Sequence, residues 1–370
     1  MIRISLCMIV KDEEEVLGGC LASVKDCVDE IVIVDTGSSD RTKEIAAQYT
    51  ENVFDFEWVN HFAKARNFAF SKATEPFIMW LDADDILSEE DQLKLKRLKE
   101  DLDETTDAVS MKYHLTFDAN GEPMFTYRRH RIVKAACGFK WQGAVHEFLQ
   151  VGGNIVTSDV AITHRKEEKT VQTNADRNIN IYEQMIIDDE TFTPRDLFYY
   201  ANELKERGRH EEAINKYEEF MQTKQGWVED EIRACQAMTH CYLAVDEPDQ
   251  AVDQALRTLK LKEPRPESCC MIGNHFQQKL DFENALFWYQ MAVHQREGDS
   301  LNFVNHAYST WYPYLQQCVC YFRLGDIPSS KEANERAAET MPEHESVIQN
   351  RKLFADLEKQ NKAEAESQDK

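Results

Sequence analysis

Four stretches decide the fold: ISLCMIVKDEE (4–14), DEIVIVDTGSSDRT (29–42), FAKARNFAF (62–70) and FIMWLDADD (77–85). Three of them contain a short, nearly continuous apolar run, at Ile4–Val10, Ile31–Val34 and Phe77–Leu81. Such runs are typical of strands that are buried on both faces of a sheet. Between the runs, residues 40–49 and 61–72 have the spacing and the starting residues of helices. Alternating strands and helices predict an α/β domain with a mostly parallel, doubly wound sheet.

The second half of the chain contains a repeat. The segments RHEEA, EPDQA, DFENA and DIPSS end at Ala213, Ala251, Ala285 and Ser330. Each lies between two apolar helical stretches, and a small residue there lets two helices cross closely. A period near 34 residues is typical of helix–turn–helix repeats. Over residues 194–345 the chain resembles the tetratricopeptide repeat family. We therefore expect an α/β domain at 1–190, an all-α repeat domain at 191–358 and a polar tail at 359–370.

Composition limits the possible functions. The chain has 370 residues, 43 Lys and Arg against 67 Asp and Glu, and a formal charge of −24. So negative a surface repels phosphates, which argues against nucleic acid as a partner. We expect no membrane span, because no apolar run approaches the ~20 residues it needs. Ten scattered cysteines do not make a disulfide framework and indicate free, mostly buried thiols. Together with the lack of a secretory signal, this predicts a cytoplasmic protein.

The pair Asp82-x-Asp84 directly follows the third apolar run. In sheets of this type, ligands bind at the carboxyl ends of the strands. Two carboxylates repel each other there unless something binds them. Mg²⁺ or Mn²⁺ shared with a diphosphate would compensate their charge. The alternative is a solvated acidic turn that leads into a helix capped by Ser88.

A second set of polar residues belongs to the same predicted edge. Asp35 follows the second apolar run, and its carboxylate can accept hydrogen bonds from a base N–H or from ribose hydroxyls. Lys64, Arg66 and Asn67 lie near the start of a predicted helix, within reach of that edge. They could hold a base or phosphates, or they could be ordinary solvated residues, and Asp35 could be a turn residue.

Taken together in this order, the four stretches resemble the catalytic domain of glycosyltransferase family 2, of the GT-A type, over about the first 165 residues. The resemblance implies a nucleotide-sugar donor, with the Lys11–Glu13 segment and Asp35 at the nucleoside and Arg66 near the base. It also implies that Asp82 contacts the ribose or the sugar and that Asp84 binds a metal that bridges the diphosphate. Asp12 departs from the family pattern, in which many members have Asn.

Downstream, YRRHRIVK (127–134) and WQGAVHEFL (141–149) continue the likeness. By analogy we expect Glu147 to be the catalytic base and His146 to orient the substrate, with the reverse assignment open. A structural His–Glu pair is the alternative. His164, in VAITHRK (160–166), follows an apolar run and could be an ordinary core or surface residue. By analogy with GT-A enzymes we expect it to complete the metal shell. Three further cations could stabilise the leaving diphosphate or simply pair with acidic side chains: Arg128, Arg129 and Arg131.

The resemblance implies a metal-dependent, inverting transfer of a hexose from a nucleotide donor, UDP-glucose being one example. A catalytic domain joined to helical repeats is similar to the sublancin-type bacterial peptide glycosyltransferases, which modify Cys, Ser or Thr. We therefore expect a peptide or protein acceptor, and homodimerisation through the repeats is an additional possibility. The alternatives are a transferase acting on a surface polysaccharide or lipid-linked glycan, and a non-catalytic scaffold.

Overall fold

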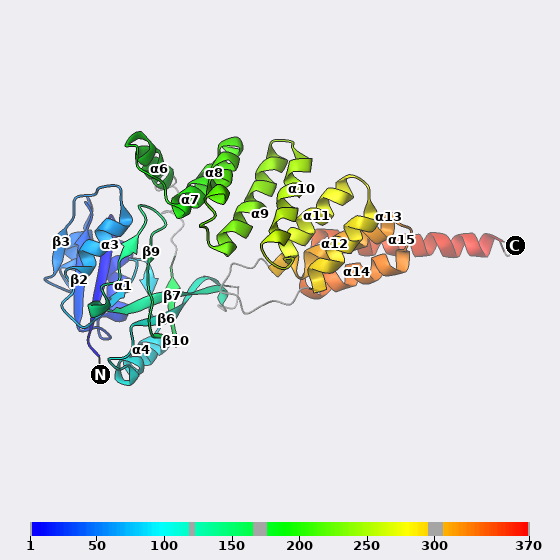
Figure 1. Cartoon of the computed structure of the whole chain (residues 1–370). Coiled ribbons are helices and arrows are strands. Elements are labelled where there is room, and N and C mark those ends of the chain that lie inside the picture. Colours follow the sequence, from blue (N-terminus) through cyan, green and yellow to red (C-terminus); the bar gives the residue numbers. More distant parts are fainter. Residues whose placement is uncertain (1, 118–122, 166–175, 295–305, 369–370) are drawn as a thin grey trace. The chain divides into compact units, whose positions relative to one another are not determined.

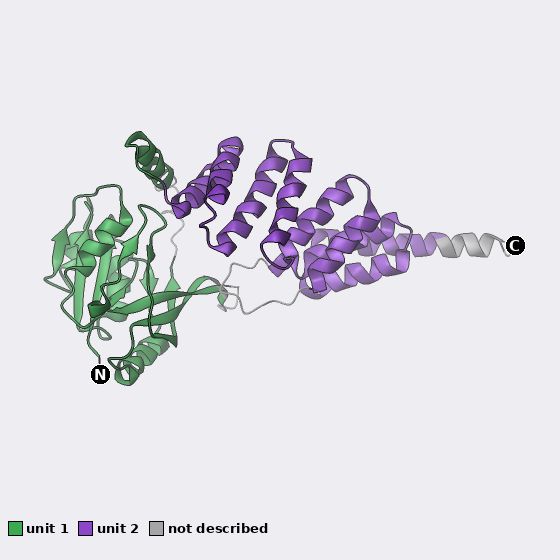
Figure 2. Cartoon of the chain, in the orientation of Figure 1, with its two compact units in different colours: residues 1–191 green, residues 192–370 purple. Residues whose placement is uncertain are grey.

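The computed structural model describes residues 2–117, 123–165, 176–294 and 306–368. The chain divides into two compact units, Met1–Thr191 and Phe192–Lys370 (Figure 2). The first combines strands with helices and the second is built from helices (Figure 1).

An eight-stranded sheet forms the centre of the first unit, in the order β3-β2-β1-β4-β7-β6-β10-β5. Its strands are β1 (Ile4–Val10), β2 (Glu30–Asp35), β3 (Val53–Asp55), β4 (Phe77–Trp80), β5 (Asp85–Ile86), β6 (Ala108–Phe117), β7 (Pro123–Lys134) and β10 (Ile155–His164). Strands β3, β2, β1 and β4 are parallel, as the sequence predicts. The sequence did not predict the antiparallel pairs of β7 with β4 and with β6. A small second sheet pairs β8 (Trp141–Gln142) with β9 (Phe148–Leu149).

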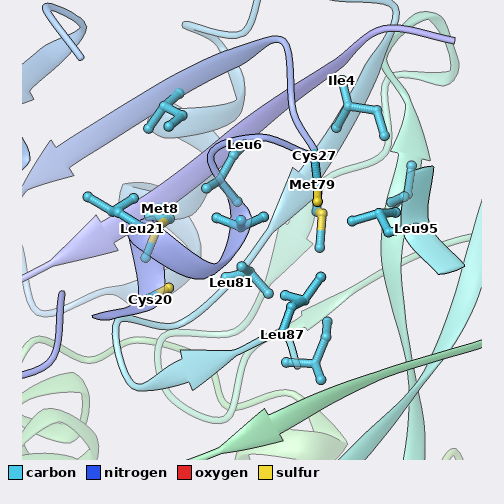
Figure 3. Close-up of a cluster of buried hydrophobic side chains, with 14 of the residues drawn as sticks. Ile4, Leu6, Met8, Cys20, Leu21, Cys27, Met79, Leu81, Leu87 and Leu95 are labelled. Carbon is cyan, nitrogen blue, oxygen red and sulfur yellow. The ribbon is translucent and has the colours of Figure 1, made fainter. Parts of the chain in front are cut away.

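Helices cover both faces of this sheet. The helices of the unit are α1 (Leu17–Val24), α2 (Thr42–Ala46), α3 (Phe62–Phe70), α4 (Glu89–Asp101) and α6 (Arg177–Ile187). Alternate residues of β1 pack with α1 and α4 in one core, and Leu6, Leu21 and Leu95 belong to the same cluster of buried side chains (Figure 3). On the other face, α3 packs against β2 and β4. Burial on both faces explains the continuous apolar runs in the sequence.

Of two local predictions for the first unit, one is confirmed and the other differs in detail. Ser88 caps α4 as predicted, since its hydroxyl accepts a hydrogen bond from the N–H of Asp91. Asp40, the first residue of the predicted helix at 40–49, instead lies two residues before α2, whose N-cap is Arg41. The carboxylate of Asp40 accepts hydrogen bonds from the N–H groups of Thr42 and Glu14. It therefore ties the loop after β2 to the loop after β1.

The second unit confirms the predicted repeat. Its helices are α7 (Pro194–Glu206), α8 (His210–Thr223), α9 (Val228–Ala244), α10 (Pro248–Arg257), α11 (Pro266–Gln278), α12 (Phe282–His294), α13 (Trp311–Arg323), α14 (Ile327–Thr340) and α15 (Glu345–Gln368). They pack as consecutive pairs from α7/α8 to α13/α14. The four repeat residues are buried, as close helix crossing requires: Ala213, Ala251, Ala285 and Ser330. None of the helices that the structure describes is long and apolar enough to span a membrane.

The end of the chain is helical. Residues 359–368, which make up most of the predicted polar tail, continue α15 as far as Gln368. The segment lacks apolar periodicity, but it consists largely of Lys, Glu, Gln and Ala, which are all strong helix formers. Local propensity therefore favours the continuation of a helix in which Val347 and Phe354 are buried.

Each repeat turns through one residue in the left-handed conformation. Gly208 and Gly325 adopt φ angles of 73° and 85° at two of the turns. Asp246 and Leu280 occupy the equivalent positions with φ angles of 62° and 61°. Only glycine adopts this conformation without steric conflict at Cβ, so Leu280 is strained, and its side chain is 73% exposed.

We expect Leu280→Gly to stabilise the second unit by about 0.5–1 kcal/mol, because it relieves the Cβ conflict and removes little buried surface. Leu353→Gly, within α15, is the matched control and should destabilise by about 1 kcal/mol. Chemical denaturation of both variants measures the difference. A loss of stability in Leu280→Gly would contradict this account.

Candidate active site

The loops that leave β1, β2 and β4 meet at one edge of the sheet. Because these three strands are parallel neighbours, their carboxyl ends lie side by side. The first two loops are joined by hydrogen bonds from the N–H of Asp12 to the Ser38 hydroxyl and from the N–H of Glu13 to the Thr42 hydroxyl. The Lys11 side chain at this edge is exposed.

Asp35 ends β2 with one carboxylate oxygen bonded and the other open. Oδ1 accepts hydrogen bonds from the N–H groups of Gly37 and Ser38, both at 2.9 Å. Oδ2 is buried and has no hydrogen-bond partner among the described residues. A buried carboxylate oxygen without a donor is costly. Asp35 is therefore ready to accept a hydrogen bond from a ligand.

Asp82, Asp84 and Asp85 follow β4, and their surroundings differ. Asp85 is fully buried. It forms an ion pair with Arg131 at 3.0 Å and accepts a hydrogen bond from the Tyr113 hydroxyl at 2.8 Å. Its Oδ2 also accepts from the N–H of Asp82 at 3.0 Å, which fixes the turn. Sequence reasoning missed Asp85, although its place beside Asp84 could have indicated a third acid.

His164, at the end of β10, lies beside Asp84 and Asp85. Its Nδ1 lies 3.3 Å from Oδ1 of Asp84 and 3.7 Å from Oδ1 of Asp85. This nitrogen is buried and lacks the alignment of a hydrogen bond to either oxygen. The two carboxylates raise the pKa of His164 to about 9, although burial opposes this. A positive charge is therefore favoured at this point.

One donor atom from each of Asp84, Asp85 and His164 lies within 4.8 Å of the others. Carboxylate oxygens suit Mg²⁺ and Mn²⁺, and an imidazole nitrogen can join such a set. The orphaned Nδ1 of His164 also fits a bound cation. Glu13 adds to the negative potential: burial and the carboxylates of Asp84 and Asp82 raise the pKa of Glu13 to about 7.

Arg66 on α3 joins Asp82 to Glu147. Its Nη2 lies 2.7 Å from Oδ1 of Asp82, and its Nε lies 2.6 Å from Oε1 of Glu147. The guanidinium packs against the rings of both Trp80 and Trp141, at 5.1 and 4.8 Å from their centroids. Burial alone would raise the pKa of Asp82, but the nearby guanidinium groups of Arg66 and Arg131 outweigh it and hold that pKa well below its usual range.

The ion pairs of Arg66 bear on two of the predicted roles. Because Arg66 already has two acidic partners, its most direct role is to hold Asp82 and Glu147 in place. Contact of Arg66 with the base of a nucleotide stays a prediction. Glu147 keeps its second oxygen out of this ion pair.

The segment before Glu147 is a tight loop. Gly143 has a φ angle of 97°, and a Cβ there would lie 3.2 Å from the Val145 carbonyl oxygen. His146 also has a positive φ angle, 50°, which a non-glycine residue rarely adopts. Local strain of this kind clusters at functional sites. The Ala144 carbonyl oxygen accepts a hydrogen bond from the N–H of Phe62, which fixes the loop to the start of α3.

A cavity of ≈ 710 Å³ opens beside the acidic cluster. Asp84 and His164 line it together with apolar side chains of α1, β5 and β6, namely Val16, Ile86, Leu115 and Phe117. A mostly apolar cavity with a few convergent polar groups is typical of small-molecule sites.

This combination of fold and site agrees with the comparison with protein families. Residues 5–152 match the model of the family described as "Glycosyl transferase family 2". The first unit therefore contains a glycosyltransferase family 2 domain, as the sequence motifs indicated.

Two glycosyltransferases and one repeat protein are similar in sequence to parts of this chain. The glycosyltransferase SunS of Bacillus subtilis is 27% identical over 231 residues, which cover 58% of this chain and 53% of that protein. The lipopolysaccharide core biosynthesis glycosyltransferase LpsC of Rhizobium meliloti is 28% identical over 159 residues, covering 41% and 58%. A TPR repeat-containing protein of Synechococcus elongatus is 51% identical over 87 residues, covering 24% and 22%. The chain thus spans less than two thirds of each.

Solved repeat proteins are similar at low identity. A crystal structure of MamA has a TM-score of 0.36 and 16% identity, and covers 43% of this chain and 84% of that one. The TPR protein YrrB, described as having an unusual peptide-binding site, has a TM-score of 0.36 and 13% identity, covering 50% and 96%.

Proposed function

We propose that this chain is a metal-dependent, inverting glycosyltransferase that transfers a hexose from a nucleoside diphosphate sugar, UDP-linked, to a Ser, Thr or Cys side chain of a peptide or protein. The observation that carries the proposal is the cluster of Asp84, Asp85 and His164 at the carboxyl edge of a family 2 domain.

In this proposal, the residues at the carboxyl edge of the sheet bind different parts of the donor. The open oxygen of Asp35 accepts a hydrogen bond from the nucleoside, and Lys11 and Glu13 lie on the loop beside it. Asp82, held by Arg66, faces the ribose or the sugar. Asp84 and His164, with Asp85 behind them, would hold Mg²⁺ or Mn²⁺. When bound, the cation would neutralise the charge that develops on the departing diphosphate.

Glu147 is the proposed general base. Its Oε1 is fixed by Arg66, so that Oε2 can take the acceptor proton as the new bond forms. His146, in its strained backbone conformation, would orient the acceptor. The cavity beside Asp84 offers room for a sugar or acceptor group next to the cluster.

A peptide acceptor is supported by the resemblance to the sublancin-type peptide glycosyltransferases and by the helical repeats, since repeats of this kind present extended surfaces to peptides. The similarity to LpsC favours a second candidate, a transferase that acts on a glycan. Homodimerisation through the second unit remains a further proposal.

Calorimetric titration with UDP, in the presence and absence of Mn²⁺, tests the donor half of the proposal. We expect binding that depends on the cation. Incubation with UDP-sugars and either peptides encoded beside the gene or lipid-linked glycans, followed by mass spectrometry, tests the acceptor half. A glycan product would favour the second candidate. No hexose transfer to any acceptor, together with no cation-dependent binding, would reject a transferase.

We expect Glu147→Gln to retain donor binding within about threefold and to lose transfer by at least about a hundredfold, because the amide keeps a partner for Arg66 but cannot take a proton. Donor titration and single-turnover transfer assays measure the two effects separately. Glu104→Gln, in an exposed loop, is the control for the charge change. Retained transfer in Glu147→Gln would remove Glu147 as the base.

A further inference from the structure

Three arginine side chains surround the ring of Trp80, which comes two residues before Asp82. The guanidinium carbon of Arg131 lies 3.9 Å from the ring centroid, that of Arg66 lies 5.1 Å away and that of Arg129 lies 5.6 Å away. The sequence grouped Arg128, Arg129 and Arg131 without separating their roles. The structure separates them by their partners.

Arg131 and Arg66 both have carboxylate partners. Arg131 is fully buried and pairs with Asp85, and Arg66 pairs with Asp82 and Glu147. Their positive charges are therefore already matched by acids of the site.

Arg128 points elsewhere on the same strand. Its Nη1 donates hydrogen bonds to the carbonyl oxygens of Ser158 at 2.9 Å and Ser110 at 3.3 Å. Its role is to connect β7 with β6 and β10.

Arg129 has a different environment. Its guanidinium lies over the rings of Trp80, Tyr113 and Tyr127, at 5.6, 5.4 and 5.3 Å from their centroids. Within the described ranges no carboxylate forms an ion pair with it. Its charge nevertheless acts on Asp82, whose pKa it helps to lower. Arg129 is partly exposed, so it is a cation that is oriented by aromatic faces and still accessible to a ligand.

An arginine held in this way is suited to a phosphate group. Guanidinium groups bind phosphate oxygens through two parallel N–H donors, and stacking on rings fixes the plane of the guanidinium in advance. Arginine charges already compensate Asp82 and Asp85, whereas the Asp84 carboxylate has no arginine partner among the described residues and would repel a diphosphate. Arg129, which has no ion pair with a carboxylate among the described residues, is therefore available to bind a phosphate, whereas Arg66 and Arg131 are held by their ion pairs.

We propose that Arg129 binds the diphosphate of the donor and stabilises it as the leaving group; this inference rests on the proposed function. In the transfer step, the bond between the anomeric carbon and the diphosphate oxygen breaks, and its electron pair stays on that oxygen. The acceptor oxygen or sulfur bonds to the anomeric carbon and gives its proton to the base. Arg129 contacts the phosphate that gains the charge and compensates that charge as the bond breaks.

Titration with UDP and with uridine, both in the presence of Mn²⁺, tests this assignment on the full chain. We expect Arg129→Gln to weaken UDP binding by at least about tenfold and to leave uridine binding unchanged, because only the diphosphate meets the guanidinium. Arg129→Lys should recover part of the loss. Lys112→Gln is the matched control, since Lys112 is a cation on β6 whose ion pair with Asp159 is exposed.

Each outcome decides between the proposals. If wild type binds UDP and Arg129→Gln binds it equally well, Arg129 has no part in diphosphate binding and only the present inference fails. Equal weakening of UDP and uridine would show a structural role and would also overturn it. If wild type binds neither UDP nor any of GDP, ADP, CDP and dTDP, the proposed function fails together with this inference.

Discussion

Replacement of Asp84 by alanine should abolish both cation-dependent donor binding and transfer, with a loss of turnover of at least about a thousandfold. Asp84 supplies the accessible carboxylate of the cluster, and its Oδ1 lies 3.3 Å from Nδ1 of His164. Without it, the cation loses a charged ligand, and the repulsion between a diphosphate and the remaining acids is no longer compensated. Mn²⁺ titration and initial-rate assays measure the two losses.

The melting temperature of this variant should stay close to that of wild type. The Asp84 side chain is 29% exposed, whereas that of Asp85 is fully buried. Removal of Asp84 also relieves repulsion from Asp82 and Glu13, so the fold loses little. Asp159→Ala, at an exposed position on β10, is the matched control and should retain full activity. Full activity in Asp84→Ala, or full activity of wild type in EDTA, would rule out a catalytic cation at this cluster.

Arg131→Met is expected to produce the largest loss of stability in the first unit, about 3–5 kcal/mol. Arg131 and Asp85 are both fully buried, and the ion pair between them is 3.0 Å long. Removal of the arginine leaves the Asp85 carboxylate buried, with hydrogen bonds from Tyr113 and from the backbone of Asp82, and the more distant His164 imidazole at 3.7 Å, to compensate its charge. The cavity left between Trp80 and Tyr113 adds to the loss.

A second substitution separates the electrostatic part from the packing part. Arg131→Met combined with Asp85→Asn should recover a substantial fraction of the loss, because no buried charge remains. Hydrogen–deuterium exchange across residues 77–86 reports the local stability, since the chain has two units and unfolding need not be two-state. Lys112→Met, which removes an exposed ion pair, should change stability by less than about 1 kcal/mol. No recovery in the double variant would assign the loss to packing alone.

The sequence predicted the parallel half of the sheet because that half follows local rules. The run Ile4–Val10 is the strand β1 itself, and the loops that leave β1, β2 and β4 carry the acids that meet at the sheet edge. The repeat was equally readable, since a buried small residue recurs after 38, 34 and 45 residues, with an insertion before the last repeat.

The rest of the site depends on contacts between distant segments. β7 pairs with β4 across more than 50 residues and brings Arg131 to Asp85 and Arg129 to Trp80. The alternation of Tyr127, Arg129 and Arg131 was a possible signal, because residues two apart on a strand share a face. Without a prediction that β7 is a strand, that signal could not be used.

The insertion of β7 beside β4 also affects how the chain is made. β4 is the last of the four parallel strands. The edge of β4 that faces away from β1 pairs only with residues 132–134 of β7. A nascent chain released after α4 would present the unpaired backbone of β4, with four apolar side chains, to other chains. A truncated catalytic fragment that omits the β6–β7 hairpin is therefore prone to aggregate, and expression of this domain requires a boundary beyond β10.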